Sequence, residues 1–117
     1  PADGQKDARR HGHLRGWVKT DNQGRYSIST IRPASYPNRK DPQHIHAIIL
    51  EPSGKYYWIH DFLFDDDPLL SAEDRNRSNA RGGNGVIKVT RDAKGVWQGK
   101  RDLTLGLNVE GYAAKQP

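Results

Sequence analysis

Clusters of turn-forming residues divide this sequence into short segments, and their spacing is the feature that most constrains the fold. Turns are predicted at residues 21–24, 52–55 and 92–95, because each contains a glycine, which tolerates conformations that other residues avoid. The segments between the turns are rich in Tyr, Trp, Ile and Val, and residues 25–31 alternate between two faces. We therefore expect an all-β fold, an antiparallel β-sandwich with many loops. The strands expected from this pattern are residues 13–20, 25–31, 44–51, 56–64, 86–90 and 96–105.

The stretch before the strongest predicted strand holds Pro33, Pro37 and Pro42, which exclude a helix or a central strand there. Residues 32–43 are therefore predicted to form a long irregular loop, and long ordered loops often carry function. After the aromatic-rich strand, residues 69–82 are expected to form a short helix or an irregular loop.

Length and composition predict one loop-rich domain over residues 1–117. Of the 117 residues, 33% are hydrophobic, 12 are glycine and 7 are proline. The formal net charge of +5 is expected to reflect a solvated surface that attracts anionic aromatic compounds, not a nucleic-acid partner. The adjacent aspartates at 65–67 are likewise expected to be solvated.

The sequence also limits the kinds of cofactor and location. There is no cysteine, which excludes disulfides, zinc–thiolate sites and iron–sulfur clusters. No apolar stretch approaches the roughly 20 residues of a membrane-spanning helix, so no membrane partner is expected. The compartment is left open.

Two histidines separated by one residue, His44 and His46, lie in the strongest predicted strand. Side chains two positions apart in a strand share a face, so both imidazoles can bind one metal ion. Tyr36 precedes them in a loop that is long enough to bring its phenol back over the same strand end. A phenolate is a hard anionic donor that suits iron(III) better than zinc or copper. The pattern therefore predicts a ferric site with Tyr36, His44 and His46 as ligands.

A longer series of residues surrounds this set, over residues 13–70. It comprises Arg15-Gly16, Thr20-Asp21, Gly24-Arg25-Tyr26, Thr30-Ile31-Arg32-Pro33, Tyr36-Pro37, Pro42-Gln43-His44-Ile45-His46, Phe64 and Asp67-Pro68-Leu69. In order and spacing this series resembles the intradiol ring-cleaving dioxygenases, the family of catechol and protocatechuate dioxygenases.

The resemblance implies the β-sandwich of that family and a ferric site with two tyrosinates, two histidines and a water or hydroxide. It also implies the reaction: both atoms of dioxygen are inserted into a catechol, and the ring opens between its hydroxylated carbons to a muconic acid. By position, Tyr36 matches the tyrosinate that leaves the iron when substrate binds, and His44 and His46 match the two histidine ligands.

The first departure from the family pattern concerns the second tyrosinate, which lies upstream of the Tyr36 position. No tyrosine precedes Tyr26, so we expect the N-terminal strands and this ligand to be missing or to come from a second chain. Tyr56, Tyr57 and Tyr112 are candidates for a replacement phenolate, although packing explains each of them equally well.

Two further departures concern the substrate side of the site. Asp41 stands where the family commonly has an arginine, so Arg39, or else Lys40, is the candidate for stabilising negative charge on the substrate. Asp61 replaces a glutamine of the family, and His60 beside it is predicted to point to the opposite strand face. The residues expected to contact the substrate are Lys40, Asp61 and Trp58.

We predict an iron(III)-dependent dioxygenase that acts on a catechol-like aromatic diol with dioxygen, with Tyr36 and Arg39 as its catalytic residues. One alternative is an inactive β-sandwich of the same fold that serves binding or assembly. Another is a zinc hydrolase that uses His44, His46 and a carboxylate. A homo-oligomer, or pairing with a second chain that supplies the missing strands and tyrosine, is expected because missing strands leave sheet edges exposed.

Overall fold

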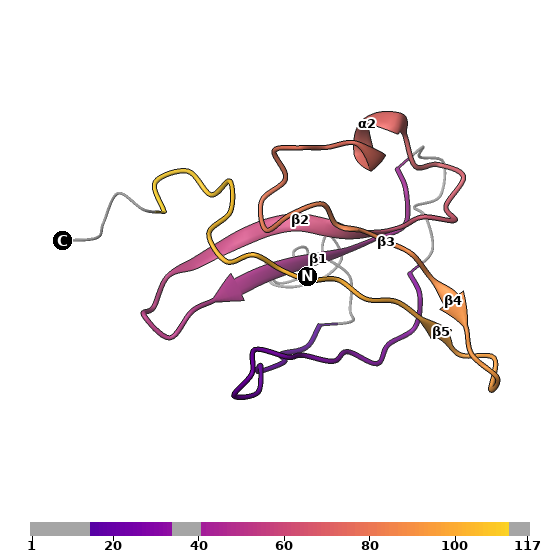
Figure 1. Cartoon of the computed structure of the whole chain (residues 1–117), viewed down its shortest axis with the longest axis horizontal. Helices are drawn as coiled ribbons and strands as arrows, with labels where there is room; N and C mark the ends of the chain where they lie inside the picture. Colours follow the sequence, from indigo (N-terminus) through magenta and orange to yellow (C-terminus); the bar gives the residue numbers. More distant parts are fainter. Residues whose placement is uncertain (1–14, 34–40, 113–117) are drawn as a thin grey trace, which may run out of the picture. The chain divides into compact units, whose positions relative to one another are not determined.

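The computed structural model describes residues 15–33 and 41–112. The chain divides after Arg32 into two compact units, and each is described by itself. The second unit contains the strands β1 (His44–Leu50), β2 (Tyr56–Phe64), β3 (Val86–Ile87), β4 (Thr90–Arg91) and β5 (Trp97–Gln98), with one short helix, α2 (Ala72–Arg75) (Figure 1). Among the described residues, strands thus outweigh the single helix of four residues, as the prediction of an all-β fold requires. No helix in this part of the chain is long and apolar enough to cross a membrane.

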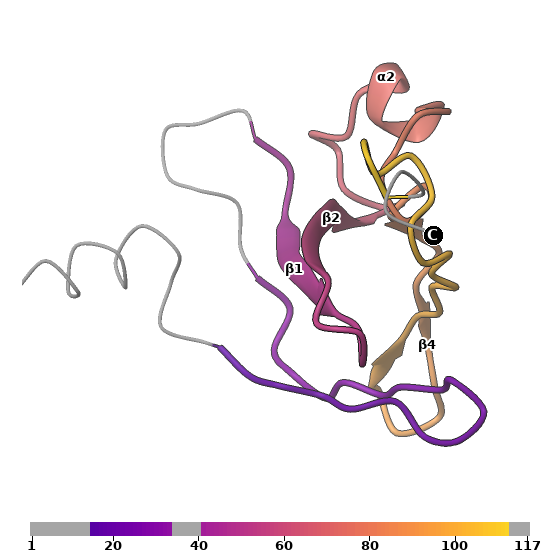
Figure 2. The same ribbon diagram turned by 90° about the vertical axis from the view of Figure 1, so that its left-hand side faces the viewer.

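Strands β1 and β2 form an antiparallel hairpin, and they run side by side in both views (Figures 1 and 2). The predicted turn closes it, with the Glu51 amide donating to the Lys55 carbonyl at 2.8 Å and Gly54 adopting a φ of 92°. Four residues of β2, two on each side of His60 and Asp61, are buried and supply most of the core of this unit, together with Leu70 and Ala80. The buried β2 residues are Tyr57, Ile59, Phe62 and Phe64.

Strand β3 extends the hairpin into a three-stranded sheet in the order β1-β2-β3, and β4 and β5 form a separate antiparallel pair. The pairing of β2 with β3 is parallel, with Leu63 opposite Val86 and Phe64 opposite Ile87. The expectation of a purely antiparallel arrangement is therefore wrong at this edge. The cause is the connection through α2, which carries the chain back so that β3 enters in the same direction as β2.

The described part of the first unit, residues 15–32, contains the predicted turn but no assigned strand. The Asp21 amide donates to the Arg25 carbonyl at 2.9 Å, and the Asp21 carboxylate accepts from the Gln23 and Arg25 amides. Trp17 is 94% exposed and Ile31 69% exposed, so the segments on either side bury no apolar face. A two-stranded hairpin without a buried face is only marginally stable, which explains why the predicted ladder is absent here.

Asp67 lies in the turn after β2 and fixes the position of the chain just before β1. Its carboxylate accepts the Gln43 amide at 2.6 Å and the Leu69 amide at 2.9 Å, and the side chain is only 3% exposed. The expectation that the aspartates at 65–67 are solvated is therefore wrong for Asp67. Because Gln43 immediately precedes His44, this buried carboxylate sets where β1 begins.

Candidate functional site

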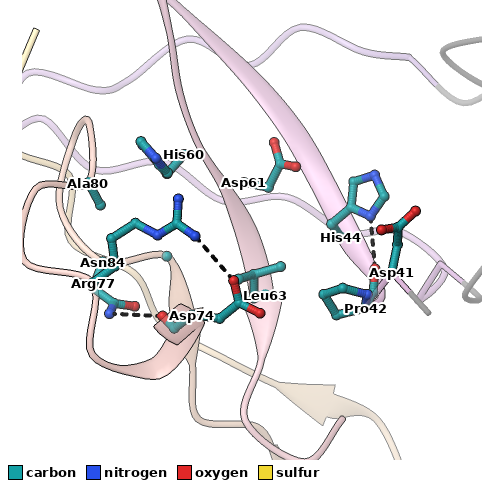
Figure 3. Close-up of a pocket in the computed structure, with 11 residues that line it drawn as sticks. Asp41, Pro42, His44, His60, Asp61, Leu63, Asp74, Arg77, Ala80 and Asn84 are labelled. Carbon is teal, nitrogen blue, oxygen red and sulfur yellow. Dashed lines mark hydrogen bonds and ion pairs between the residues drawn. The ribbon is translucent and has the colours of Figure 1, made fainter. Parts of the chain in front are cut away.

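An irregularity in the hairpin changes how three polar residues face one another. The register of β1 and β2 shifts between Ile45 and Ala47, so that His46 alone stands opposite both His60 and Asp61. This is a β-bulge, with two residues of one strand against one of its partner. His60 and Asp61 consequently line the same pocket (Figure 3), and the prediction that they point to opposite faces is wrong. The rule of alternation holds for a regular strand and fails at an inserted residue.

Each of the two β1 histidines is held through its Nδ1 atom by an oxygen. The Nδ1 atom of His44 lies 2.9 Å from the carbonyl oxygen of Pro42, and that of His46 lies 3.0 Å from the carboxylate of Asp61. Carbonyl and carboxylate oxygens only accept, so Nδ1 of each neutral ring carries the proton and donates it. The basic lone pair of each ring is therefore on Nε2, which is the arrangement found in metal-ligating histidines.

A pocket of about 340 Å³ lies beside His44, between the bulge and the segment that follows β2 (Figure 3). This volume lies within the range that small-molecule sites occupy. Its lining is mixed, with carboxylates, imidazoles and a guanidinium around a few apolar groups. The lining residues are Asp41, Pro42, His44, His60, Asp61, Leu63, Asp74, Arg77, Ala80, Asn84 and Gly85.

His60 is held differently from the other two histidines. Its Nδ1 atom accepts the Arg81 amide at 2.8 Å, and its own amide donates to the Arg81 carbonyl at 3.1 Å. Burial lowers the pKa of His60 below its ordinary value, and the positive charge of Arg77 lowers this pKa further. His60 is therefore a neutral imidazole whose proton is on Nε2, so it is a hydrogen-bond donor in the pocket.

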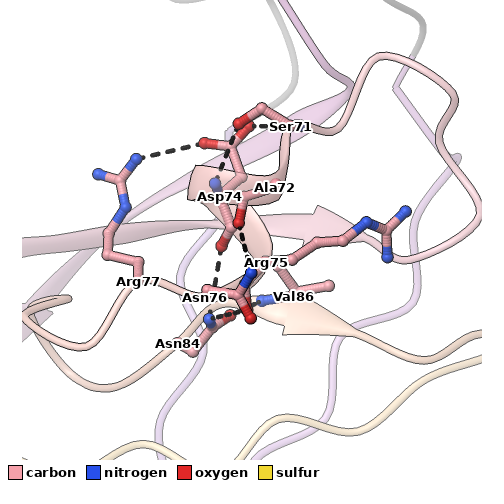
Figure 4. Close-up of polar contacts among 8 residues, drawn as sticks. All are labelled: Ser71, Ala72, Asp74, Arg75, Asn76, Arg77, Asn84 and Val86. Carbon is pink, nitrogen blue, oxygen red and sulfur yellow. Dashed lines mark hydrogen bonds and ion pairs between the residues drawn. The ribbon is translucent and has the colours of Figure 1, made fainter.

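Helix α2 and the loop after it place Arg77 at the pocket (Figure 4). Ser71 and Asp74 form a reciprocal capping box, with the Ser71 hydroxyl accepting the Asp74 amide and the Asp74 carboxylate accepting the Ser71 amide. The same carboxylate accepts from the Arg77 guanidinium at 3.2 Å. Asn84 then ties this loop to β3, because its amide donates to the Arg75 carbonyl and its oxygen accepts the Val86 amide.

The tyrosines considered as replacement phenolates are engaged at the other end of the hairpin. Tyr57 and Tyr112 both donate their hydroxyls to the Glu51 carboxylate, at 2.7 and 2.8 Å. Burial and the hydrogen bond to Glu51 raise the pKa of Tyr57 to about 12, which opposes formation of a phenolate. Tyr56 is paired with Leu50 at the same end, away from the His44–Leu63 pair, and is 76% exposed.

The structure places none of the four remaining predicted site residues at the pocket. Tyr36, Arg39 and Lys40 lie outside the described residues. Trp58 does not line the pocket, and its ring packs instead under the Arg81 guanidinium at 4.0 Å and beside the His60 ring at 5.3 Å. Within residues 15–33 and 41–112, no three His, Cys, Asp or Glu side chains are grouped to hold a metal ion.

Two residues of the pocket, His60 and Arg77, were not among the sequence candidates. No short motif marks either of them. The only signal for Arg77 is a basic residue in a predicted loop, and the signal for His60 is hidden by the bulge.

Comparisons with protein-family models, with curated proteins and with solved structures found no match for this chain. Function is therefore inferred from the residues of the site and from their geometry.

Proposed function

We propose that this protein is a non-haem iron(III) dioxygenase of the intradiol type, which opens a catechol-like ring between its two hydroxylated carbons. The observation that carries the proposal is that His44 and His46 each have an oxygen acceptor at Nδ1. Both rings donate from Nδ1 to an oxygen, so both have their basic nitrogen at Nε2.

Imidazole nitrogens and a phenolate oxygen are donors that suit iron(III). Asp61 supports this fit because its carboxylate orients His46 and increases the basicity of that ring, as carboxylates behind metal-ligating histidines do. This gives Asp61 a positioning role in place of the expected substrate contact. Tyr36 is the third proposed ligand, on the basis of its place in the sequence pattern. The zinc-hydrolase alternative is less favoured, because Asp61 is engaged on the Nδ1 side of His46 and not beside Nε2.

The residues of the pocket beside His44 support a small aromatic ligand. The pocket begins at His44 and contains Leu63 as an apolar wall, with His60 and Arg77 as donors. When bound, ferric iron would draw electron density from the diol and so prepare the ring for attack by dioxygen. The chain itself would bind and orient the ring, and Arg39 or Lys40 would stabilise negative charge on it.

The experiment is a ring-cleavage assay on the iron-loaded chain with catechol and dioxygen. We expect dioxygen uptake that matches formation of the ring-opened diacid, with strong loss of both in His44→Ala. Tyr36→Phe should also reduce activity and weaken the visible charge-transfer colour. Lys100→Gln, which changes an exposed side chain, should match the wild type. Oxygen uptake without ring opening, or wild-type activity in His44→Ala, would refute the proposal.

A second candidate is a β-module that retains the fold and serves binding or assembly. Four large side chains on the outer face of the hairpin favour it, because a contiguous apolar surface often marks an interaction site. They are Ile48, Leu50, Tyr56 and Trp58, which are 63%, 62%, 76% and 46% exposed. Two results together would favour this candidate over the dioxygenase. The iron-loaded chain would show no ring cleavage, and it would associate in a concentration-dependent way that Ile48→Lys abolishes.

A further inference from the structure

The pocket wall opposite His44 is formed in part by His60 and Arg77 (Figure 3). We propose that these two residues form an oxyanion corner, in which His60 donates a hydrogen bond from Nε2 and Arg77 supplies positive charge to an anionic oxygen of an aromatic ligand. The identity of the ligand as an aromatic diol rests on the proposed function. The corner itself requires no iron, so it is testable separately.

The backbone determines which nitrogen of His60 is the donor. The Arg81 amide can only donate, and it points at the Nδ1 atom of His60 at 2.8 Å. Nδ1 must therefore keep its lone pair, and the proton of the neutral ring must be on Nε2. The tautomer of His60 is thus opposite to that of His44 and His46, whose Nδ1 atoms face oxygens. The same pocket contains a histidine suited to binding a metal and a histidine suited to binding an oxygen.

His60 is also held in place by its backbone. Its amide donates to the Arg81 carbonyl at 3.1 Å, and its carbonyl accepts from the Arg101 guanidinium at 2.8 Å. The same guanidinium donates a second hydrogen bond, to the Gly83 carbonyl at 3.1 Å. A donor fixed on both sides loses little freedom when it binds a ligand, which favours a binding role.

The charged groups that act on the His60 ring are mostly positive, although the carboxylates of Asp41, Asp61 and Asp74 also line the pocket. Arg77, Arg101 and Arg81 all act on this ring with the same sign, and Asp61 opposes them. Arg77 is paired with Asp74 at 3.2 Å, and its side chain remains 32% exposed at the pocket. A neutral donor beside several guanidinium groups attracts an anionic oxygen more than a neutral one.

Two sources could supply this oxygen on an aromatic diol, namely one of the diol oxygens or a carboxylate on the ring. Both present an anionic or partly anionic acceptor to the His60 donor. The two sources are distinguished by comparing catechol with 3,4-dihydroxybenzoate, which differ only in the ring carboxylate.

The test uses the full chain after treatment with a chelator, so that iron plays no part. Nitrogen-15 spectra of the histidine rings should show His60 protonated on Nε2 alone at neutral pH. Titration with each probe, followed by the amide signals of Gly85, should show binding. His60→Phe and Arg77→Gln should each weaken binding of at least one probe by roughly tenfold, as expected for loss of a charge-assisted hydrogen bond. His60→Gln, which keeps a side-chain donor, should recover part of the loss, and Lys100→Gln should change nothing.

Weakening of both probes places a diol oxygen in the corner, and weakening of 3,4-dihydroxybenzoate alone places the carboxylate there. The proposal is overturned if the folded wild-type chain binds neither probe, if both variants bind both probes as the wild type does, or if His60 is protonated on Nδ1. If the probes bind as predicted but the iron-loaded chain does not cleave the ring, the proposed dioxygenase activity is refuted and the oxyanion corner is retained. If the chain cleaves the ring but His60→Phe and Arg77→Gln bind the probes as the wild type does, only the oxyanion corner is refuted.

Discussion

Gly85 offers a test of the site geometry, because the chain passes very close to the bulge there. A Cβ atom added to Gly85 would lie 2.0 Å from the Asp61 carbonyl oxygen and 3.1 Å from the Cζ atom of Arg101. Real Cβ contacts stay at or above 3.0 Å, so Gly85→Ala requires a separation of 3.0 − 2.0, or 1.0 Å, between two backbone segments. The neighbour is backbone and not a flexible side-chain end, so it cannot turn away.

The expected cost has two parts. Overpacking of this kind costs about 1–3 kcal/mol. The separation also strains the bond from the Leu63 amide to the Gly85 carbonyl, which is 2.9 Å long and joins β2 to the chain before β3. Loss of that bond adds about 1 kcal/mol. Gly85→Ala should therefore lower the free energy of unfolding by about 2–4 kcal/mol.

The assay is urea unfolding followed by tryptophan fluorescence. A loss of about 2–4 kcal/mol lowers the midpoint by at least about 0.7 M for a slope of about 1–3 kcal/mol per M. Gly16→Ala is the matched control, because nothing lies within 4 Å of its added Cβ, and it should stay within about 0.5 kcal/mol of the wild type. A Gly85→Ala midpoint as close to the wild type as that of the control would refute the close approach of residue 85 to the bulge.

Asp61→Asn should weaken metal binding by about 10–100-fold, because the amide supports His46 less strongly than the carboxylate does; chelator competition measures this, and an unchanged affinity would contradict the positioning role of Asp61. Asp67→Asn should lower the free energy of unfolding by about 1–3 kcal/mol. The substitution replaces one of two buried carboxylate oxygens with an NH2 group, which cannot accept the backbone amide that this oxygen binds. An unchanged free energy of unfolding in chemical denaturation would argue against this anchor. The pKa of His60 is lower in the folded chain than its ordinary 6.5, so the unfolded chain binds more protons as the pH falls below 6.5. The free energy of unfolding should therefore be highest above that pH and should decrease below it, and the decrease should be smaller in His60→Gln. Denaturation midpoints at about pH 7.5 and about pH 5.5 measure this decrease. An equal decrease in both proteins would contradict the prediction.

The hairpin that carries the candidate ligands could be predicted from sequence because its signals agree with one another. Residues 44–51 and 56–64 are apolar and aromatic, and a glycine turn separates them; the structure gives His44–Leu50 and Tyr56–Phe64. The turns at 21–24 and 92–95 were predictable for the same reason, since Asp21 and Asp92 accept the amides that follow them.

The bulge could not be predicted, because an inserted residue leaves no mark in the pattern of alternation. His60 and Asp61 are consecutive, and a regular strand would separate them. The proposed oxyanion corner was hidden for a further reason, because Arg77 reaches the pocket through a capping box and loop contacts that depend on tertiary structure. Likewise, Asp67 is buried only because the Gln43 and Leu69 amides reach it, which its acidic neighbours did not suggest.

Whether His44 and His46 hold ferric iron is tested most directly by metal analysis and a visible absorption spectrum of the chain after loading with iron(III). We predict stoichiometric iron and a broad tyrosinate-to-iron(III) band that shifts when catechol is added, with iron and band both lost in His44→Ala. A colourless protein that retains no iron, or a His44→Ala variant that retains iron and band as the wild type does, would contradict the proposed ferric site.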